Sequence, residues 1–295
     1  MILNNGLQKK IFIIFTILIF LVINIYKTMK LENFDNKTEE LKLACVLTSV
    51  NTNPEYLDFI PLFIKSWTKF YPDVEIKIIL IGEKIPLEYK KYEKYIILYK
   101  PPNSKISTAF ISQFIRLLYP SLLKYNNGIM ITDIDSIPLN NKYFTDNLKG
   151  ISNNTWLNYR NWKDRNQIAM CWQIATPKIW KEVFNINNML DIDSTLIEVY
   201  SKINYKDGST DKNWFTDQLF LYEKVMLWNK KTNNYRFLHD KNTGYNRLDR
   251  INFKNIDKKI ELNLKKGLYS DYHMLRPPKK YEIINNKVID LVNLS

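Results

Sequence analysis

The sequence GIMITDIDSIPL, residues 128–139, is the most informative part of this 295-residue chain. Its first four residues are apolar and are bounded by a glycine before and a proline after, which predicts a short buried strand. Asp133 and Asp135 follow at the carboxyl end of that strand, where open α/β sheets place their ligand sites. In extended geometry the two carboxylates point to one side while Ile134 turns into the core. Two hard oxygen ligands at this place suit Mg²⁺ or Mn²⁺ bound to a diphosphate.

The same four-residue pattern occurs a second time, as DIDS at residues 191–194, and there its context differs. The residues before it do not form a convincing buried strand, and the apolar residues after it return at helical spacing. Asp193 is therefore predicted to be the N-cap of a helix, where acidic side chains are favoured. The preceding strand and the following proline turn are what make the first copy a candidate site.

Strand-like and helix-like segments alternate around the decisive stretch. Asn53 and Pro54 are typical of a helix start, and Pro61 predicts a kink soon after. Strands are predicted at residues 43–50, 76–81, 95–99, 128–131 and 168–176, and helices at 56–70, 107–124 and 214–227. This alternation predicts an α/β fold with a mostly parallel sheet that has helices on both faces.

The N-terminus carries a nearly unbroken apolar run from Ile11 to Ile25, flanked by lysines. We expect a transmembrane signal anchor at residues 11–26, although the length also fits a cleaved signal peptide. The expected organisation is a tail at 1–10, the anchor at 11–26, a stem at 27–41 and a catalytic domain at 42–295, divided into a nucleotide-binding half at 42–140 and an acceptor half at 141–295. The expected location is a single-pass type II position in an ER, Golgi or equivalent host or envelope membrane.

Composition limits the function classes. The net charge is +13, but the excess lysines are scattered among asparagines and isoleucines, and there is no arginine-rich block or zinc-finger pattern. A nucleic-acid partner is therefore not expected. Only 7 glycines occur, which argues against glycine-rich phosphate loops. Cys45 and Cys171 lie in apolar runs without a metal-ligand spacing, so buried free thiols are expected.

Four segments resemble the GT-A glycosyltransferases, which transfer sugars from nucleotide-diphosphate donors with Mn²⁺ or Mg²⁺. They are the strand end at 48–49, QFIRLLYP at 113–120, TDIDSIPL at 132–139 and DYHMLRP at 271–277. The resemblance implies a Rossmann-like GT-A fold and an enzyme that uses a UDP- or GDP-sugar donor. The acceptor would be a hydroxyl of a carbohydrate, glycoprotein or glycolipid.

The resemblance also implies residue roles. The metal ligands would be Asp133, Asp135 and His273, the catalytic residues Asp217 and Asp135, and the donor-binding residues Thr48, Gln113, Arg116, Asp133, Arg276 and Lys279. Asp217, near a helix start, would act as general base in an inverting enzyme or would orient the acceptor in a retaining one. Two of these residues also have ordinary explanations, a solvated side chain for Arg116 and a favourable first-turn acid for Asp217. The polar cluster RLDR at 247–250 has no assigned role.

Two other classes stay open at this point. A two-metal nuclease or phosphotransferase would use Asp133, Asp135 and Asp217, but it needs a further acidic residue on a neighbouring strand, and no clear one is found. A non-catalytic, membrane-tethered binding module has only the positive charge in its favour.

Overall fold

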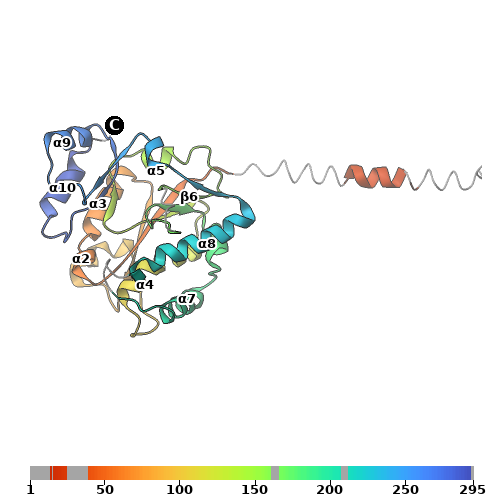
Figure 1. The fold of residues 1–295 in the computed structure, drawn as a ribbon, viewed down its shortest axis with the longest axis horizontal. Helices are drawn as coiled ribbons and strands as arrows, with labels where there is room; N and C mark the ends of the chain where they lie inside the picture. Colours follow the sequence, from red (N-terminus) through yellow and green to blue (C-terminus); the bar gives the residue numbers. More distant parts are fainter. Residues whose placement is uncertain (1–13, 15, 25–38, 161–165, 207–211, 294–295) are drawn as a thin grey trace, which may run out of the picture. The chain divides into compact units, whose positions relative to one another are not determined.

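The strand that carries the Asp-x-Asp sequence lies at the centre of a seven-stranded sheet in a computed structural model of the chain (Figure 1). The structure describes residues 14, 16–24, 39–160, 166–206 and 212–293. Two units are distinguished, residues 1–39 and residues 40–295, and the second contains all the strands. The predicted division of 42–295 into two halves stays a prediction.

The large sheet has the order β3-β2-β1-β4-β7-β6-β8. Its strands are β1 (Leu43–Asn51), β2 (Glu75–Ile81), β3 (Ile96–Tyr99), β4 (Gly128–Ile131), β6 (Trp156–Asn158), β7 (Gln173–Ala175) and β8 (Tyr235–Phe237). The half from β3 to β4 is parallel, whereas β7 runs antiparallel to both β4 and β6. A mixed α/β fold is therefore confirmed, with the parallel half where the sequence predicts it.

Alternating side chains of β1 explain why helices cover both faces of the sheet. Val46 and Val50 belong to one buried cluster, which includes residues of α3. Cys45 and Leu47 belong to the other cluster, which includes residues of α4. The helix α4 contacts α6, α7 and α8 on its side of the sheet, and α3 contacts α10 on the other side (Figure 1).

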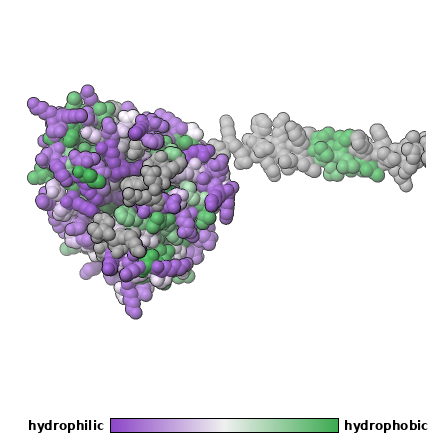
Figure 2. Space-filling view, in the orientation of Figure 1, coloured by the Kyte–Doolittle hydropathy of each residue, from purple (hydrophilic) through white to green (hydrophobic). Residues whose placement is uncertain are grey.

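Figure 2 shows a largely hydrophilic face with separate apolar spots. The most exposed apolar side chains lie on separate elements, for example Leu87, Leu190 and Ile283.

The helical elements from residue 40 onward are α2 (Pro54–Leu57), α3 (Ile60–Phe70), η1 (Leu87–Tyr95), α4 (Thr108–Leu118), η2 (Tyr119–Leu122), α5 (Tyr143–Asp146), α6 (Pro177–Phe184), α7 (Met189–Ser201), η3 (Lys212–Phe215), α8 (Thr216–Thr232), η4 (Asp240–Asn242), α9 (Lys258–Lys265) and α10 (Glu282–Leu291).

A second, three-stranded sheet joins the Asp-x-Asp turn to the C-terminal part of the chain. It consists of β5 (Ser136–Pro138), β10 (Tyr269–His273) and β9 (Asn246–Asp249). In this sheet Ser136 pairs with His273, and His273 pairs with Asp249. The register therefore places the histidine of DYHMLRP directly beside the residue that follows Asp135.

Local signals explain several helix boundaries. The side chain of Asn53 accepts a hydrogen bond from the backbone of Glu55, and Pro61 lies in the first turn of α3, after the chain has broken from α2. The predicted N-cap at Asp193 is wrong, because Asn188 caps α7 and forms a capping box with Asp191. Asp193 instead accepts a hydrogen bond from Tyr99 at 2.5 Å.

The structure does not support the predicted transmembrane helix at residues 11–26. Within the described residues, no helix is both long enough and apolar enough to cross a membrane. Residues 16–24 are helical. Residues 1–13, 15 and 25–26, and most of the predicted stem, lie outside the described part of the chain.

Both cysteines are buried free thiols, as predicted. Burial raises the pKa of Cys45 to about 12 and also raises that of Cys171. Cys45 and Cys171 belong to different buried clusters. Neither thiol is therefore poised as a nucleophile, because the thiolate is the reactive form.

Candidate functional site

The Asp-x-Asp sequence forms a tight turn between β4 and β5. The backbone of Thr132 donates to Leu47 on β1 at 3.1 Å, and the backbone of Ser136 donates to Asp133 at 3.1 Å. The strand ends at Ile131, so the expectation that both carboxylates point to one side of an extended strand is wrong. Ile134 is buried, as expected. The turn directs the two carboxylates to different partners.

Asp133 is paired with the buried guanidinium of Arg116. Nη1 of Arg116, in the last turn of α4, donates to the Asp133 carboxylate and to the Thr132 carbonyl at 3.2 Å. Nη2 of Arg116 lies 3.4 Å from Oδ2 of Asp217. Burial would lower the pKa of Arg116, but the carboxylates of Asp133 and Asp217 outweigh it and raise that pKa. Arg116 is thus a buried cation between two acids and not a solvated side chain.

Asp217 is a buried acid in the first turn of α8. Its Oδ1 accepts a hydrogen bond from the backbone of Gln218 at 2.8 Å. Burial raises the pKa of Asp217 to about 6, Arg116 works in the opposite direction, and Asp133 adds to the rise. A carboxyl group with a pKa near 6 can change its protonation state under ordinary reaction conditions.

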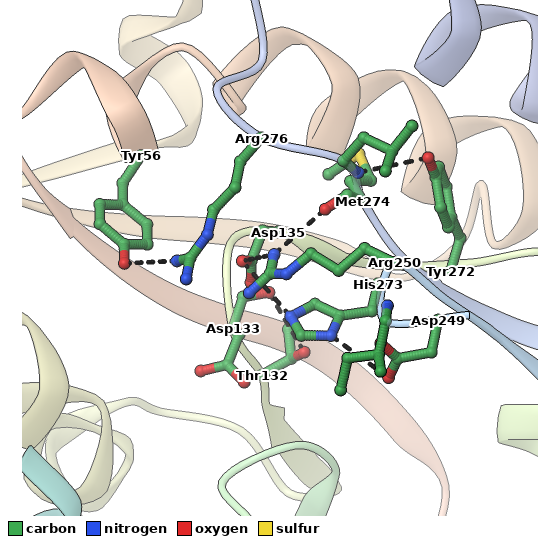
Figure 3. A network of polar contacts seen from close by, with 12 residues as sticks. Tyr56, Thr132, Asp133, Asp135, Asp249, Arg250, Tyr272, His273, Met274 and Arg276 are labelled. Atoms are coloured by element: carbon green, nitrogen blue, oxygen red, sulfur yellow. Dashed lines mark hydrogen bonds and ion pairs between the residues drawn. The ribbon is translucent and has the colours of Figure 1, made fainter. Parts of the chain in front are cut away.

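Asp135 contacts a second set of cations (Figure 3). Its Oδ2 lies 2.5 Å from Nη1 of Arg250 and 3.5 Å from Nε2 of His273. Nη1 of Arg250 also donates to the Met274 carbonyl at 3.1 Å. Burial would raise the pKa of Asp135, but hydrogen bonds and charges from His273 and Arg250 prevail and lower it. Asp135 is therefore an ionised carboxylate.

His273 lies between two carboxylates. Its Nε2 faces Asp135, and its Nδ1 lies 3.4 Å from Oδ2 of Asp249. Burial would lower the pKa of His273, but Asp135 and Asp249 raise it to about 9. Asp249 thereby fixes the orientation of the ring, as outer carboxylates do for histidines in functional sites.

A further cluster of charged side chains contacts Asp249. Arg247 contacts Asp249 at 3.3 Å and Asp271 at 2.9 Å, and Arg160 contacts Asp271 at 3.1 Å. Burial raises the pKa of Asp271, which also accepts a hydrogen bond from Ser270 at 2.6 Å. Acids and arginines thus alternate in a chain of ion pairs that leads from Asp249 to Arg160.

Arg276 lies at the edge of the site. Its guanidinium donates to the hydroxyl of Tyr56 at 2.7 Å and lies 5.6 Å from the centre of that ring (Figure 3). Lys279 is exposed and pairs with Asp58 at 3.3 Å. Figure 3 shows Arg276 beside Asp135, whereas the described ion pair of Lys279 is with Asp58.

The predicted site residues fall into two sets. The structure brings together Arg116, Asp133, Asp135, Asp217, His273 and Arg276. Of the others, Gln113 accepts a hydrogen bond from Tyr205 at 2.9 Å, and Thr48 is fully buried with a hydroxyl that has no partner among the described residues. Arg250 and Asp249 received no role from the sequence, and the polar cluster at 247–250 was the signal that could have identified them.

The donor types at Asp135 suit a divalent cation. Asp135 Oδ2 and His273 Nε2 face one another, and carboxylate and imidazole are acceptable ligands for Mn²⁺. Within the described residues, however, no group of three acidic, histidine or cysteine side chains is arranged to hold a metal. Asp133, the expected third ligand, is held by Arg116. Among the described residues of this site, Asp135 and His273 are thus the two side chains that could bind a cation together.

No family model matches the sequence, and neither does any curated protein. Among solved structures, the chain is similar to the galactosyltransferase LgtC in complex with donor and acceptor sugar analogues, with 12% identity, 85% of this chain and 97% of that chain covered, and a TM-score of 0.45. It is also similar to the glycosyltransferase GlyE of Streptococcus pneumoniae TIGR4, with 16% identity, 86% and 61% covered, and a TM-score of 0.46. Both are glycosyltransferases, the class that the sequence resembles. With TM-scores below 0.5, these similarities assign no function to this chain.

Proposed function

We propose that this chain is a metal-dependent glycosyltransferase that moves a sugar from a nucleoside-diphosphate donor to a hydroxyl acceptor. The observation that carries the proposal is the Asp135–His273 pair at the carboxyl end of the parallel strands, with Arg250 and Arg276 beside it. Oxygen and nitrogen donors for a cation, surrounded by guanidinium groups for an anion, suit a cation bound to a diphosphate.

The residues divide the work as follows. Asp135 and His273 would hold the cation, for which His273 must give up the proton that its raised pKa favours. The cation, when bound, would act as a Lewis acid and neutralise the charge of the leaving diphosphate. Arg276 would bind a phosphate oxygen, since its present partner is a neutral tyrosine hydroxyl. Arg116 would hold the carboxylates of Asp133 and Asp217 in place, one on each Nη atom.

Asp217 is the candidate for the acceptor hydroxyl. It is buried, its pKa is raised to about 6, and its carboxylate is directed toward Arg116 next to Asp133. As a general base it would accept the hydroxyl proton, and in a retaining reaction it would orient that hydroxyl. The two-metal nuclease alternative is less well supported, because Asp133 and Asp217 are both committed to Arg116.

The direct test is the release of nucleoside diphosphate from a panel of UDP- and GDP-sugars by the full chain. We expect release from one donor with added Mn²⁺ or Mg²⁺, loss of release with EDTA, and recovery when the cation is returned. Cleavage of a phosphodiester or phosphomonoester in place of the glycosidic bond would instead support the nuclease or phosphotransferase class.

The pH dependence of this activity should follow Asp217. The carboxylate, which accepts or orients the hydroxyl, is the form above its pKa of about 6, so kcat/KM should fall as the pH drops from 8 to 5. Arg116 and Asp133 are the charged groups that face Asp217. Asp217→Asn should lower the rate by roughly a hundredfold or more and remove this dependence. An unchanged pH profile in Asp217→Asn would refute the assignment.

A further inference from the structure

Arg250 occupies a position on Asp135 that a bound cation would need. It is the first residue after β9, and its backbone donates to the His273 carbonyl at 3.2 Å, so its Cα is anchored. Its side chain is 18% exposed and ends on Asp135 at 2.5 Å and on the Met274 carbonyl at 3.1 Å. The guanidinium therefore lies against an acid and a carbonyl, both of which are oxygen donors of the type that divalent cations bind.

Asp135 Oδ2 contacts both the guanidinium of Arg250 and Nε2 of His273 in this arrangement (Figure 3). The positive charges of a divalent cation and of a guanidinium repel each other strongly when both lie next to the same buried carboxylate. A divalent cation that binds Oδ2 of Asp135 does so in competition with the guanidinium of Arg250. Binding of the cation and the contact of Arg250 with Asp135 are thus mutually unfavourable.

The other arginines of the site have different carboxylate partners. Arg116 bridges two acids, Asp133 and Asp217, and Arg247 contacts Asp249 and Asp271. If Arg116 moved, it would leave the carboxylates of Asp133 and Asp217 without their described counter-charge, which is costly. The one described carboxylate partner of Arg250 is Asp135, the proposed metal ligand. Arg250 can therefore leave its acid without cost to the fold if a cation replaces it there.

We propose that Arg250 exchanges partners during donor binding: it neutralises Asp135 in the ligand-free site and transfers to the donor's diphosphate when a divalent cation takes its place. This inference rests on the proposed function, since it names the residue that receives the leaving group. A guanidinium suits this role because its planar fork binds two phosphate oxygens at once. Arg250 is thus a diphosphate-binding residue that also sets the affinity of the empty site for metal.

The exchange predicts opposite effects on two affinities in one variant, Arg250→Gln. Binding of Mn²⁺ to the full chain without nucleotide, followed by electron paramagnetic resonance of free Mn²⁺, should become roughly tenfold tighter because the competing cation is gone. Binding of UDP and GDP at saturating Mn²⁺ should become at least roughly tenfold weaker for whichever nucleotide the unmodified chain prefers. Arg236→Gln is the matched control, because Arg236 is exposed and donates to backbone carbonyls of Asn233 and Tyr235, and it should change neither affinity.

A second variant, Arg250→Lys, keeps the charge but not the fork. It should leave Mn²⁺ affinity close to that of the unmodified chain and restore only part of the nucleotide affinity. The exchange is overturned if Arg250→Gln leaves Mn²⁺ affinity unchanged or weakens it, or if nucleotide binding is unaffected. An unmodified chain that binds neither UDP nor GDP with Mn²⁺ would instead refute the proposed function, and the exchange with it.

Discussion

Replacing Asp135 with asparagine is expected to reduce the metal-dependent release of nucleoside diphosphate by about a thousandfold. The substitution keeps the size of the side chain but removes the negative charge that Arg250 and His273 share. A cation bound at a neutral amide loses its charged ligand, and electrostatic stabilisation of a leaving anion is usually a large part of catalysis. The measurement is the initial rate at saturating Mn²⁺ for the donor that the panel identifies.

The second Asp-x-Asp sequence provides a matched control for this prediction. Asp193 occupies the same position in its triplet as Asp135, but it lies within α7 and accepts a hydrogen bond from Tyr99. Asp193→Asn should therefore leave the rate within twofold of the unmodified chain. Thermal unfolding of both variants separates lost catalysis from lost structure. A full rate in Asp135→Asn would exclude Asp135 as a metal ligand.

The parallel half of the fold could be predicted because its signals are local. The apolar runs of β1, β2 and β3 and the amphipathic spacing of α4 are each contained in one short segment. β6, β7 and β8 have three residues each, too few for a periodic pattern, and β7 is accordingly shorter than the predicted strand at 168–176. The capping box at Asn188 was present in the sequence as an Asn three residues before an Asp, and that signal could have prevented the misplaced N-cap.

The candidate site was predicted in part for the same reason. Asp133 and Asp135 stand out because a strand precedes them and a proline turn follows. The contact of Asp135 with Arg250 spans 115 residues and depends on the register of β9 against β10, which no local pattern specifies. The burial of Arg116 could not be predicted either, because it depends on two acids that lie in other elements.

Arg116 also leads to the second large expected effect, which concerns stability. Arg116→Leu should lower the free energy of unfolding by about 3–5 kcal/mol, because removing one partner of a buried ion pair leaves the other charges uncompensated. For a domain of this size that loss corresponds to a decrease in the unfolding temperature of roughly 6–20 °C. Asp133 and Asp217 would both lose their described cation. Arg236→Leu, at an exposed arginine, should change the stability by less than about 0.5 kcal/mol.

The pH dependence of this loss identifies its cause. Burial already raises the pKa of Asp217 to about 6, above its unfolded value of 3.8, and Arg116 works against that rise. A folded pKa above the unfolded one means that the ionised acid opposes folding fully above the folded pKa. This opposition declines as the pH falls from the folded pKa and is gone below the unfolded one. Without Arg116 this pKa rises further, so the destabilisation of Arg116→Leu should be larger at pH 8 than at pH 5. Urea unfolding of both chains at the two pH values is the measurement. A loss that is equal at both would mean that packing, and not the uncompensated charge of Asp133 and Asp217, accounts for the contribution of Arg116.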